Sequence, residues 1–374
     1  MRPPRVNHAA QTSASCAALN RSSPPIYGLF GFRPPADAST QPEFEWQLAT
    51  AWPKNFPGAG QGPEKLADLV SEMSNGRLKI RVFGAGEKMP SLDVFNAVSE
   101  GRIEMAHSAS YYWHDTIPAS PFFAAVPFGM TAQETNAWLN YGGGMALWEK
   151  AYRPYGVIPM AGGASGVQMG GWFNLQINTV DDLKGLRIRI PGNGAEVMRR
   201  LGAQPVNLPA SEIFQALQSN QLDAAEWVGP YNDLALGLYQ AGQYYYYPGW
   251  HEPNATFEFL VNQSAFEALP QDLQAILKTA AQAVNQDVLN EYTARNNDAL
   301  NILVHEYGVE LRPFPKAVLD KLRETSRQVI EEASKEDELS HQVYMSYMTF
   351  MNKVVRWHNI SEKPMLNARA PLSP

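Results

Sequence analysis

The chain has 374 residues, of which 45% are hydrophobic and 18% are charged, and its formal net charge is −7. That length suits two domains, because single hydrophobic cores stop growing near ~250–300 residues, and the acidic balance provides no basic surplus for nucleic acid or an anionic membrane. The single cysteine, Cys16, excludes a disulfide framework and any cysteine-based zinc site.

The first 42 residues are rich in Pro, Ser and Arg, and they contain no apolar run of the ~7–15 residues that a signal peptide needs. No later stretch approaches the ~18 apolar residues of a membrane span. We therefore interpret residues 1–42 as a disordered head, or as an extension upstream of the true start, and we expect no recognisable export signal in it.

The ordered part begins with alternating apolar and polar residues at 44–49, which predict a strand. A helical pattern follows from about Pro63, and Asn75–Gly76 supplies a left-handed stop. Residues 77–83 alternate again, with Leu78, Ile80 and Val82 on one face. Strand, helix and strand in this order are typical of an α/β fold.

Two later segments resemble each other, namely PSLDVFNAVSEGRIEMAH (90–107) and PASEIFQALQSNQLDAAE (209–226). Aligned without gaps, they match Phe95 with Phe214, Ala97 with Ala216, Gly101 with Asn220, Ile103 with Leu222 and Glu104 with Asp223. Each reads as a capped helix, a turn and a short buried strand, so we expect two similar lobes. The alternative is that any helix, turn and strand would look alike. His107 and Glu226 are equivalent, just past the buried strand, where open α/β sheets place ligands.

A helical pattern continues from Pro270 to about Glu306 and ends at Gly308. Its length of about 50 Å exceeds one small lobe, so this helix should bridge both. A strand at 309–314 and two further helices complete the chain. The last helix is rich in Met and aromatic residues, and a helix of that kind packs on a lobe or on a partner.

Two segments carry side chains suited to an anionic ligand at the junction of the lobes. In GVQMGGWF (166–173), glycines allow close approach of the backbone, and Gln168 offers both a donor and an acceptor. In the strand around Arg187 and Arg189, the second arginine stands at the carboxyl end, where its planar guanidinium can hold a carboxylate through two bonds. A glycine-rich strand edge and surface ion pairs are the alternatives.

Two carboxylates lie in loops bounded by glycine and proline. Glu226 precedes Trp227 in EWVGPYN, and Glu252 ends YYYYPGWHE. Near a cationic arginine, such carboxylates could be an acid/base pair, two structural ion pairs or ligands of a hard cation. Oxygen ligands without cysteine or paired histidine favour sodium, calcium or magnesium over zinc.

The run LKGLRIRIPGNGAEVMRRLGAQPVNLPASEIFQALQSNQLDAAEW (183–227) strongly resembles the solute receptors of tripartite ATP-independent periplasmic (TRAP) transporters. The segments GVQMGGWF, EWVGPYND and YYYYPGW are similar to the branch that binds 2-oxo acids such as pyruvate together with a metal ion. The resemblance extends from about Phe44 to the end of the chain.

The resemblance implies an α/β fold with two lobes, a ligand cleft between them and a long bridging helix. It implies a first lobe of residues 43–166 plus 255–294 and a second of 167–254 plus 295–340. Residues 341–374 would form a C-terminal helix and tail, through which a homodimer is possible. The protein would be periplasmic and would deliver a 2-oxo or 2-hydroxy monocarboxylate to the permease subunits in the membrane.

The resemblance also implies roles for single residues. Arg189 would clamp the substrate carboxylate, and Gln168 would be a second contact that also touches the metal. The metal ligands would be Glu226, the carbonyl of Trp227, and Glu252, with sodium or calcium as the ion. A final set would close over the substrate: Trp227, and from the other lobe Trp52, Tyr111 and Tyr112.

A metal-dependent lyase or aldolase acting on a 2-oxo acid is the alternative function, because those reactions also chelate the substrate. It would need a catalytic Lys or His beside the carboxylates. The only near candidate is His251, which we interpret as a structural loop histidine. The sequence has no phosphate-binding loop, no nucleophile elbow and no HExxH motif. We therefore predict a binding protein and not an enzyme.

Overall fold

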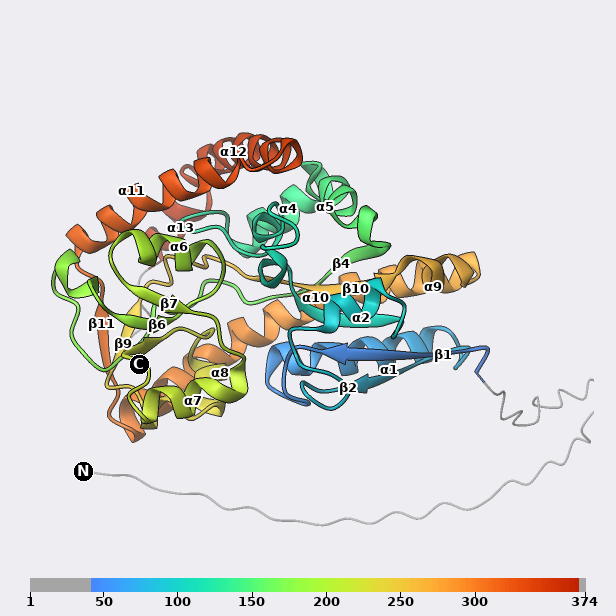
Figure 1. The fold of residues 1–374 in the computed structure, drawn as a ribbon, viewed down its shortest axis with the longest axis horizontal. Helices are drawn as coiled ribbons and strands as arrows, with labels where there is room; N and C mark the ends of the chain where they lie inside the picture. Colours follow the sequence, from blue (N-terminus) through green and yellow to red (C-terminus); the bar gives the residue numbers. More distant parts are fainter. Residues whose placement is uncertain (1–41, 370–374) are drawn as a thin grey trace, which may run out of the picture. The chain divides into compact units, whose positions relative to one another are not determined.

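A computed structural model of the chain describes residues 42–369. The predicted head, except for Pro42, and Cys16 lie outside the described residues. The fold contains two sheets, which Figure 1 shows side by side in the view, with helices around both. The first has the strand order β2-β1-β3-β10-β4. Its strands are β1 (Phe44–Thr50), β2 (Leu78–Phe83), β3 (Met105–Ala109), β4 (Val157–Ala164) and β10 (Thr256–Asn262).

The first sheet begins with the strand–helix–strand unit that the sequence predicts. Strands β1 and β2 are parallel, and the alternating residues Leu78, Ile80 and Val82 of β2 are buried. Helix α1 (Gly62–Met73) ends where Asn75 and Gly76 both adopt positive φ angles, 53° and 75°. β3 is parallel to β1, whereas β10 is antiparallel to β3 and β4.

The second sheet has the order β11-β9-β5-β8-β6-β7. Its strands are β5 (Gly171–Phe173), β6 (Arg187–Arg189), β7 (Gln204–Val206), β8 (Ala224–Ala225), β9 (Tyr244–Tyr247) and β11 (Glu310–Pro313). β6 is parallel to β7 and β8, and β5 is antiparallel to β8 and β9. The carboxyl ends of β6 and β8 therefore point the same way, which brings Arg189 beside the residue that follows β8.

Helices surround both sheets. They are α2 (Val94–Ser99), α3 (Pro121–Ala124), α4 (Ala132–Tyr141), α5 (Gly144–Tyr152), α6 (Gly192–Arg200), α7 (Ala210–Gln218), α8 (Pro230–Ala235), α9 (Gln263–Ala268), α10 (Gln271–Asn301), α11 (Lys316–Ala333), α12 (Glu338–His358) and α13 (Glu362–Ala368). The predicted bridging helix is α10, which packs on α1 and β4 and also on α8. One helix thus contacts elements on both sides of the molecule.

The two similar sequence segments have the same local structure. Gly101 and Asn220, which align, both have positive φ, 69° and 57°. In the first segment the Ala97 carbonyl accepts from the N–H groups five and six residues later, and in the second the Ala216 carbonyl accepts in the same way. Because β3 belongs to the first sheet and β8 to the second, the same unit recurs once in each lobe.

The predicted equivalence of His107 and Glu226 as ligand-facing residues is wrong. β3 continues to Ala109 because it pairs with β10, so His107 lies within the strand and is fully buried. Its Nδ1 accepts from Trp52 Nε1 at 2.9 Å, and its Nε2 lies 3.1 Å from the Gly162 carbonyl. Burial lowers the pKa of His107 to about 4, which keeps the ring neutral. His107 therefore supports Trp52 from inside the lobe.

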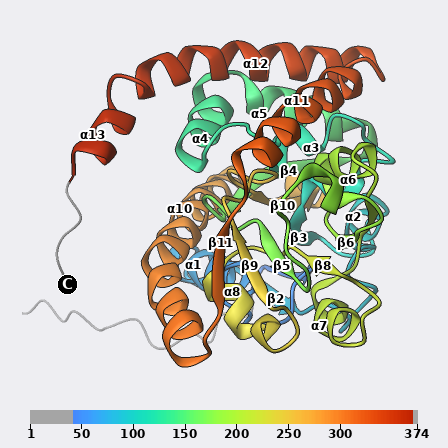
Figure 2. The same ribbon diagram turned by 90° about the vertical axis from the view of Figure 1, so that its left-hand side faces the viewer.

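The last helices run from one lobe to the other. α11 packs on α6, beside the second sheet, whereas α12 packs on α3, α4 and α5, beside the first. Figure 2 shows α12 lying over α4 and α5, with α13 extending beyond them. Val343 and Tyr347 of α12 are buried in that contact. The turn between α11 and α12 is thus one more connection between the lobes, beside α10.

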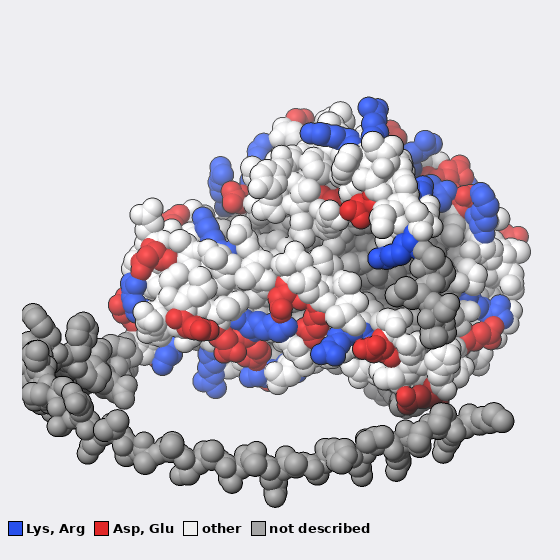
Figure 3. Space-filling view, turned by 180° about the vertical axis from the view of Figure 1, so that it is seen from behind, with Lys and Arg blue, Asp and Glu red and all other residues white. Residues whose placement is uncertain are grey.

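Acidic and basic side chains are interspersed over the face that Figure 3 shows. Such mixing is typical of a surface without one dominant charge. Among residues 42–369, no helix combines the length and the apolar character that crossing a membrane would require.

Candidate functional site

Arg189 and Glu226 meet at the carboxyl ends of β6 and β8. The Glu226 N–H donates to the Arg189 carbonyl at 3.1 Å, which continues the pairing of the two strands. Arg189 Nη1 donates to the Glu226 backbone carbonyl at 2.9 Å and also contacts the carboxylate Oε1. Both side chains are only 1% exposed. A buried ion pair of this kind needs further partners to offset its desolvation.

The remaining nitrogens of Arg189 are not equivalent. Nε donates to the Leu208 carbonyl at 3.2 Å. Nη2 is buried, and no acceptor for it exists within the part of the chain that the structure describes. The guanidinium carbon lies 5.1 Å from the centre of a Trp227 ring. By contrast, Arg187 is half exposed and pairs with Asp223, so only the second strand arginine has a free, buried donor.

Gln168 and Glu252 come from the two segments that cross between the sheets, residues 165–170 and 248–255. Gln168 Nε2 donates to Glu252 Oε2 at 2.7 Å, and the Gln168 N–H donates to the Glu252 carbonyl at 3.2 Å. Both side chains are buried. Gln168 Oε1 accepts no hydrogen bond from any described residue, so it is a buried acceptor without a donor. Such a group is costly unless something binds there.

His251, a loop histidine as interpreted from the sequence, joins this group through its contact with Glu226. Its Nε2 lies 3.0 Å from Glu226 Oε2, and it is as buried as the carboxylate. One ligand atom each from Glu226, His251 and Glu252 lies within 4.8 Å of the others. The signal in the sequence was the position of His251 directly before Glu252 in a loop between two strands.

The charges of the cluster act on one another. Burial and the nearby Glu226 charge raise the pKa of Glu252 well above its usual value. Burial alone would lower the pKa of Arg189, but the charge of Glu226 and the other acidic groups nearby together outweigh burial, so the pKa of Arg189 is raised. Two carboxylates and one guanidinium leave a negative surplus in a water-poor place, which favours a bound cation.

Aromatic side chains from the first lobe cover the cluster. Trp52 and Phe56 contact the Trp227 ring edge-on, with ring centres 6.0 and 6.3 Å away. Tyr111 and Tyr112, in the short helix η2 (Ser110–Trp113), lie with their rings 4.8 Å apart. Burial and the Glu252 charge raise the pKa of Tyr111, which agrees with a place beside the carboxylates. The structure therefore brings together all the predicted site residues.

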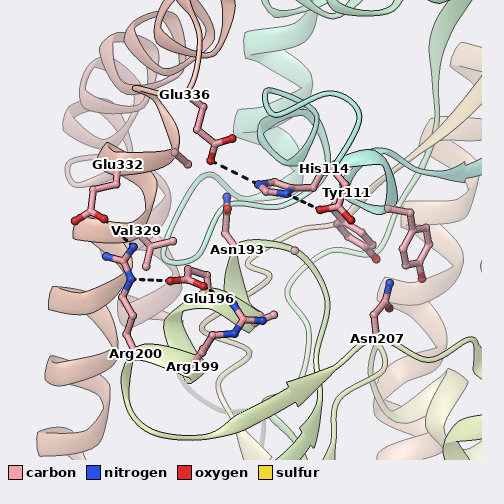
Figure 4. A pocket seen from close by; sticks show the side chains of 15 residues that line it. Tyr111, His114, Asn193, Glu196, Arg199, Arg200, Asn207, Val329, Glu332 and Glu336 are labelled. Atoms are coloured by element: carbon pink, nitrogen blue, oxygen red, sulfur yellow. Dashed lines mark hydrogen bonds and ion pairs between the residues drawn. The ribbon is translucent and has the colours of Figure 1, made fainter.

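A cavity of about 500 Å³ lies beside the site, and of the predicted site residues only Tyr111 and Tyr112 line it. Figure 4 shows its charged side chains pairing with each other. Arg200 contacts Glu332 at 2.7 Å and Glu196 at 2.9 Å. Because these charges already have partners, the cavity is a weaker candidate for recognising an acid than the buried cluster, with its free donor and free acceptor.

Comparisons with known proteins agree with this geometry. The model of the bacterial extracellular solute-binding proteins, family 7, matches residues 48–337. A monocarboxylate 2-oxoacid-binding periplasmic protein of Nostoc sp. is 44% identical over 321 residues, which cover 86% of this chain and 88% of the relative.

Solved structures are similar over the same part. A TRAP periplasmic solute-binding protein of Pseudoalteromonas atlantica, with bound sodium and pyruvate, has a TM-score of 0.85 and 42% identity over 87% of this chain and 99% of its own. One of Colwellia psychrerythraea, with bound calcium and pyruvate, has a TM-score of 0.85 and 41% identity at the same coverages. A third, of Bordetella bronchiseptica, with calcium and picolinate, has a TM-score of 0.85 and 35% identity, and the match covers 87% of this chain and 97% of its own.

These matches confirm the resemblance and the two-lobed fold predicted from the sequence. They also support a binding protein and give no support to the lyase alternative, since the family is one of receptors and not of enzymes. The chain belongs to the bacterial extracellular solute-binding proteins of family 7, the solute receptors of TRAP transporters.

Proposed function

We propose that the protein binds a small 2-oxo monocarboxylate such as pyruvate, or its 2-hydroxy equivalent, together with a sodium or calcium ion. The observation that carries this proposal is the buried cluster of Arg189, Glu226 and Glu252, which has a free donor at one end and, at Gln168, a free acceptor at the other. The relatives from Nostoc, Pseudoalteromonas and Colwellia, named for 2-oxo acids or found with pyruvate, support the ligand class.

In this proposal Arg189 Nη2 receives the carboxylate of the ligand. That nitrogen is buried and unpaired among residues 42–369, whereas Nη1 and Nε are already bonded. A charged hydrogen bond in such surroundings is strong because little water competes for it. Trp227, Tyr111 and Tyr112 enclose the rest of the ligand and exclude water.

The donor set fits a hard cation. Oxygen atoms of Glu226, Glu252, Gln168 and the Trp227 carbonyl are the ligand types that sodium and calcium prefer. His251 would act on the ion indirectly, since its Nε2 holds Glu226 Oε2 at 3.0 Å and so orients the carboxylate. A cation held by these residues would offset the negative surplus of the site and would supply a positive centre for the oxygens of the ligand.

Binding would draw the lobes together. We propose that the first lobe comprises residues 43–166 plus 255–294 and the second 167–254 plus 295–340, with Gln168 and Glu252 at the crossings. A ligand that contacts groups of both lobes stabilises the closed form over the open one. The closed receptor would be the form that the permease subunits recognise, outside the cytoplasm and in the periplasm.

We further propose that a second copy of the chain covers the C-terminal helices. Large apolar side chains are exposed there, namely Val355, Trp357, Ile360, Met365 and Leu366. Val355 and Trp357 lie in the last turns of α12, and the other three lie beyond that helix. The relative from Bordetella bronchiseptica, 35% identical, is described as a dimer.

Calorimetric titration of the purified protein with pyruvate, after exhaustive removal of metal, tests the proposal. Binding should be weak or absent without metal and should return with calcium or sodium. Mass spectrometry of the protein as purified should find a small 2-oxo or 2-hydroxy acid. If pyruvate bound as tightly in chelated, sodium-free buffer as with calcium or sodium, the proposed role of the metal would be contradicted. If pyruvate bound in none of these buffers, the proposed ligand class would be contradicted.

A further inference from the structure

The buried side chain of Asn232 connects the two lobes close to the site. Asn232 lies in α8, six residues after Glu226, and is 0% exposed. Its Nδ2 donates to the Pro57 carbonyl at 2.9 Å, and its Oδ1 accepts from the Tyr292 hydroxyl at 2.8 Å. Pro57 belongs to the segment that joins β1 to α1 in the first lobe, and Tyr292 belongs to the bridging helix α10.

The hydrogen bonds form one directional chain. The Ala59 N–H donates to the Tyr292 oxygen at 3.2 Å, and the Tyr292 hydroxyl in turn donates to Asn232. Rotating the Asn232 amide by half a turn would set oxygen against the Pro57 carbonyl and NH₂ against the O–H of Tyr292. Only one orientation therefore satisfies both ends of the side chain.

The backbone between Pro57 and Ala59 lies directly on the Tyr292 ring. Gly58, with φ +64°, has no room for a side chain, because an added Cβ would lie 2.5 Å from Tyr292 Cζ. The ring, the loop and the amide are thus packed in direct contact. We call the side chains of Asn232 and Tyr292, with the backbone of Pro57 and Ala59, the closing latch.

The closing latch joins the same two segments that cover the site. Trp52 and Phe56, whose rings contact Trp227, stand just before Pro57. Asn232 lies in α8, which begins three residues after Trp227, and the N–H groups of Val228 and Gly229 before this helix donate to Asp233 Oδ1 at 3.3 and 3.2 Å. Separation of the lobes would break the Asn232 to Pro57 bond and the aromatic contact together.

We propose that Asn232 is a positioning residue that holds segment 52–59 over Trp227 and so sets how long a ligand is retained. The inference rests on the proposed function, because retention presupposes a ligand. A bond present only in the closed form stabilises that form against opening, so its loss should act on release. Association begins from the open form, in which the bond does not yet exist, and should change little.

The test is stopped-flow tryptophan fluorescence with pyruvate in calcium buffer. Asn232→Ala removes the buried hydrogen bonds to Pro57 and Tyr292 and should release pyruvate at least about ten-fold faster, with the association rate within about two-fold of the parent. Tyr292→Phe, which keeps the ring on Gly58, should also speed release, and the double variant should add little because the two side chains act as one unit.

The matched control is Asn296→Ala. Asn296 also joins α10 to α8, through the Tyr231 N–H at 3.1 Å, but it makes no bond to segment 52–59. Its release rate should stay within about two-fold of the parent. Unchanged release in both latch variants would overturn the proposal, as would an equal increase in the control. If Asn232→Ala does not fold, Tyr292→Phe decides.

Hydrogen exchange without ligand separates this inference from the proposed function. If the parent binds no pyruvate, the ligand assignment fails, but the latch is still judged by the exchange of the Ala59 amide. Faster exchange across residues 52–59 in Asn232→Ala than in Asn296→Ala would support the closing latch. Equal exchange in the two variants would overturn it.

Discussion

Gln168 and Glu252, on the two segments that cross between the sheets, are joined by a side-chain hydrogen bond of 2.7 Å and a backbone bond of 3.2 Å. The Gly249 N–H returns a bond to the Gln168 carbonyl at 2.9 Å. The proposed ligand groups are thus part of the connection about which the lobes would turn. A metal ion or an acid bound by these side chains would therefore contact the crossing segments 165–170 and 248–255 directly.

Replacing Arg189 by alanine should weaken pyruvate binding by about 2–5 kcal/mol, because the ligand carboxylate and Glu226 would both lose their buried partner. Calorimetric titration measures the change. Arg187→Ala is the matched control on the same strand, since Arg187 is half exposed and paired with Asp223. Arg187→Ala should weaken pyruvate binding by less than about 1 kcal/mol. Equal losses in the two variants would refute the assignment of the clamp.

Glu252→Gln should weaken calcium binding at least about ten-fold, since the site loses one charged oxygen ligand while the volume stays the same. Isothermal titration with calcium after chelation checks this. Glu258→Gln is the matched control, because Glu258 is also fully buried but contacts Trp113 and Tyr152 instead of the cluster. A calcium affinity in Glu252→Gln like that of the control would remove Glu252 from the metal site.

Local patterns in the sequence predict local structure well. The alternation of Leu78, Ile80 and Val82 gives the buried face of β2, and Asn75–Gly76 gives the end of α1. The position of Arg189 at the end of its strand marks a side chain that points into the site. These features depend on near neighbours in the chain, so the spacing of residues is enough to predict them.

Contacts between distant segments could not be predicted in this way. Nothing in the spacing of His107 or Asn232 tells which strand or loop lies against it. Glu258 was missed for a related reason, since it stands between Phe257 and Phe259 and looks like a solvent-facing position. Both faces of that sheet are covered by helices, so the polar position is interior as well.

Replacing two exposed apolar residues, Trp357 and Ile360, by aspartate should abolish self-association through the C-terminal helices, because charge would enter an apolar contact. Sedimentation of the parent should give a dimer and that of the variant a monomer. Aspartate at Tyr141, which is 93% exposed on α4, is the control and should leave the mass unchanged. A monomeric parent at high concentration would contradict the dimer.

The stability of the protein should depend on the protonation of Glu258 between about pH 4.5 and pH 8. Both of its oxygens accept hydrogen bonds, from Trp113 Nε1 at 2.7 Å and from the Tyr152 hydroxyl at 2.9 Å. Burial raises the pKa of Glu258 from 4.5 to about 8. The folded chain therefore holds this proton more tightly than the unfolded chain does. The contribution of this proton to the free energy of unfolding is complete below about pH 4.5 and is lost as the pH rises to about 8.

Glu258→Gln removes this dependence, because the amide stays neutral. Relative to the parent, the variant should gain free energy of unfolding between pH 5 and pH 9, on the order of 4 kcal/mol if the whole shift is realised. Urea unfolding of the variant and the parent at pH 5 and at pH 9 measures this gain. Asp233→Asn is the contrast, because burial raises the pKa of Asp233 only to about 6. The difference in free energy of unfolding between Asp233→Asn and the parent should therefore change below pH 7. If the difference in free energy of unfolding between Glu258→Gln and the parent stayed constant from pH 5 to pH 9, Glu258 would not titrate in that pH range.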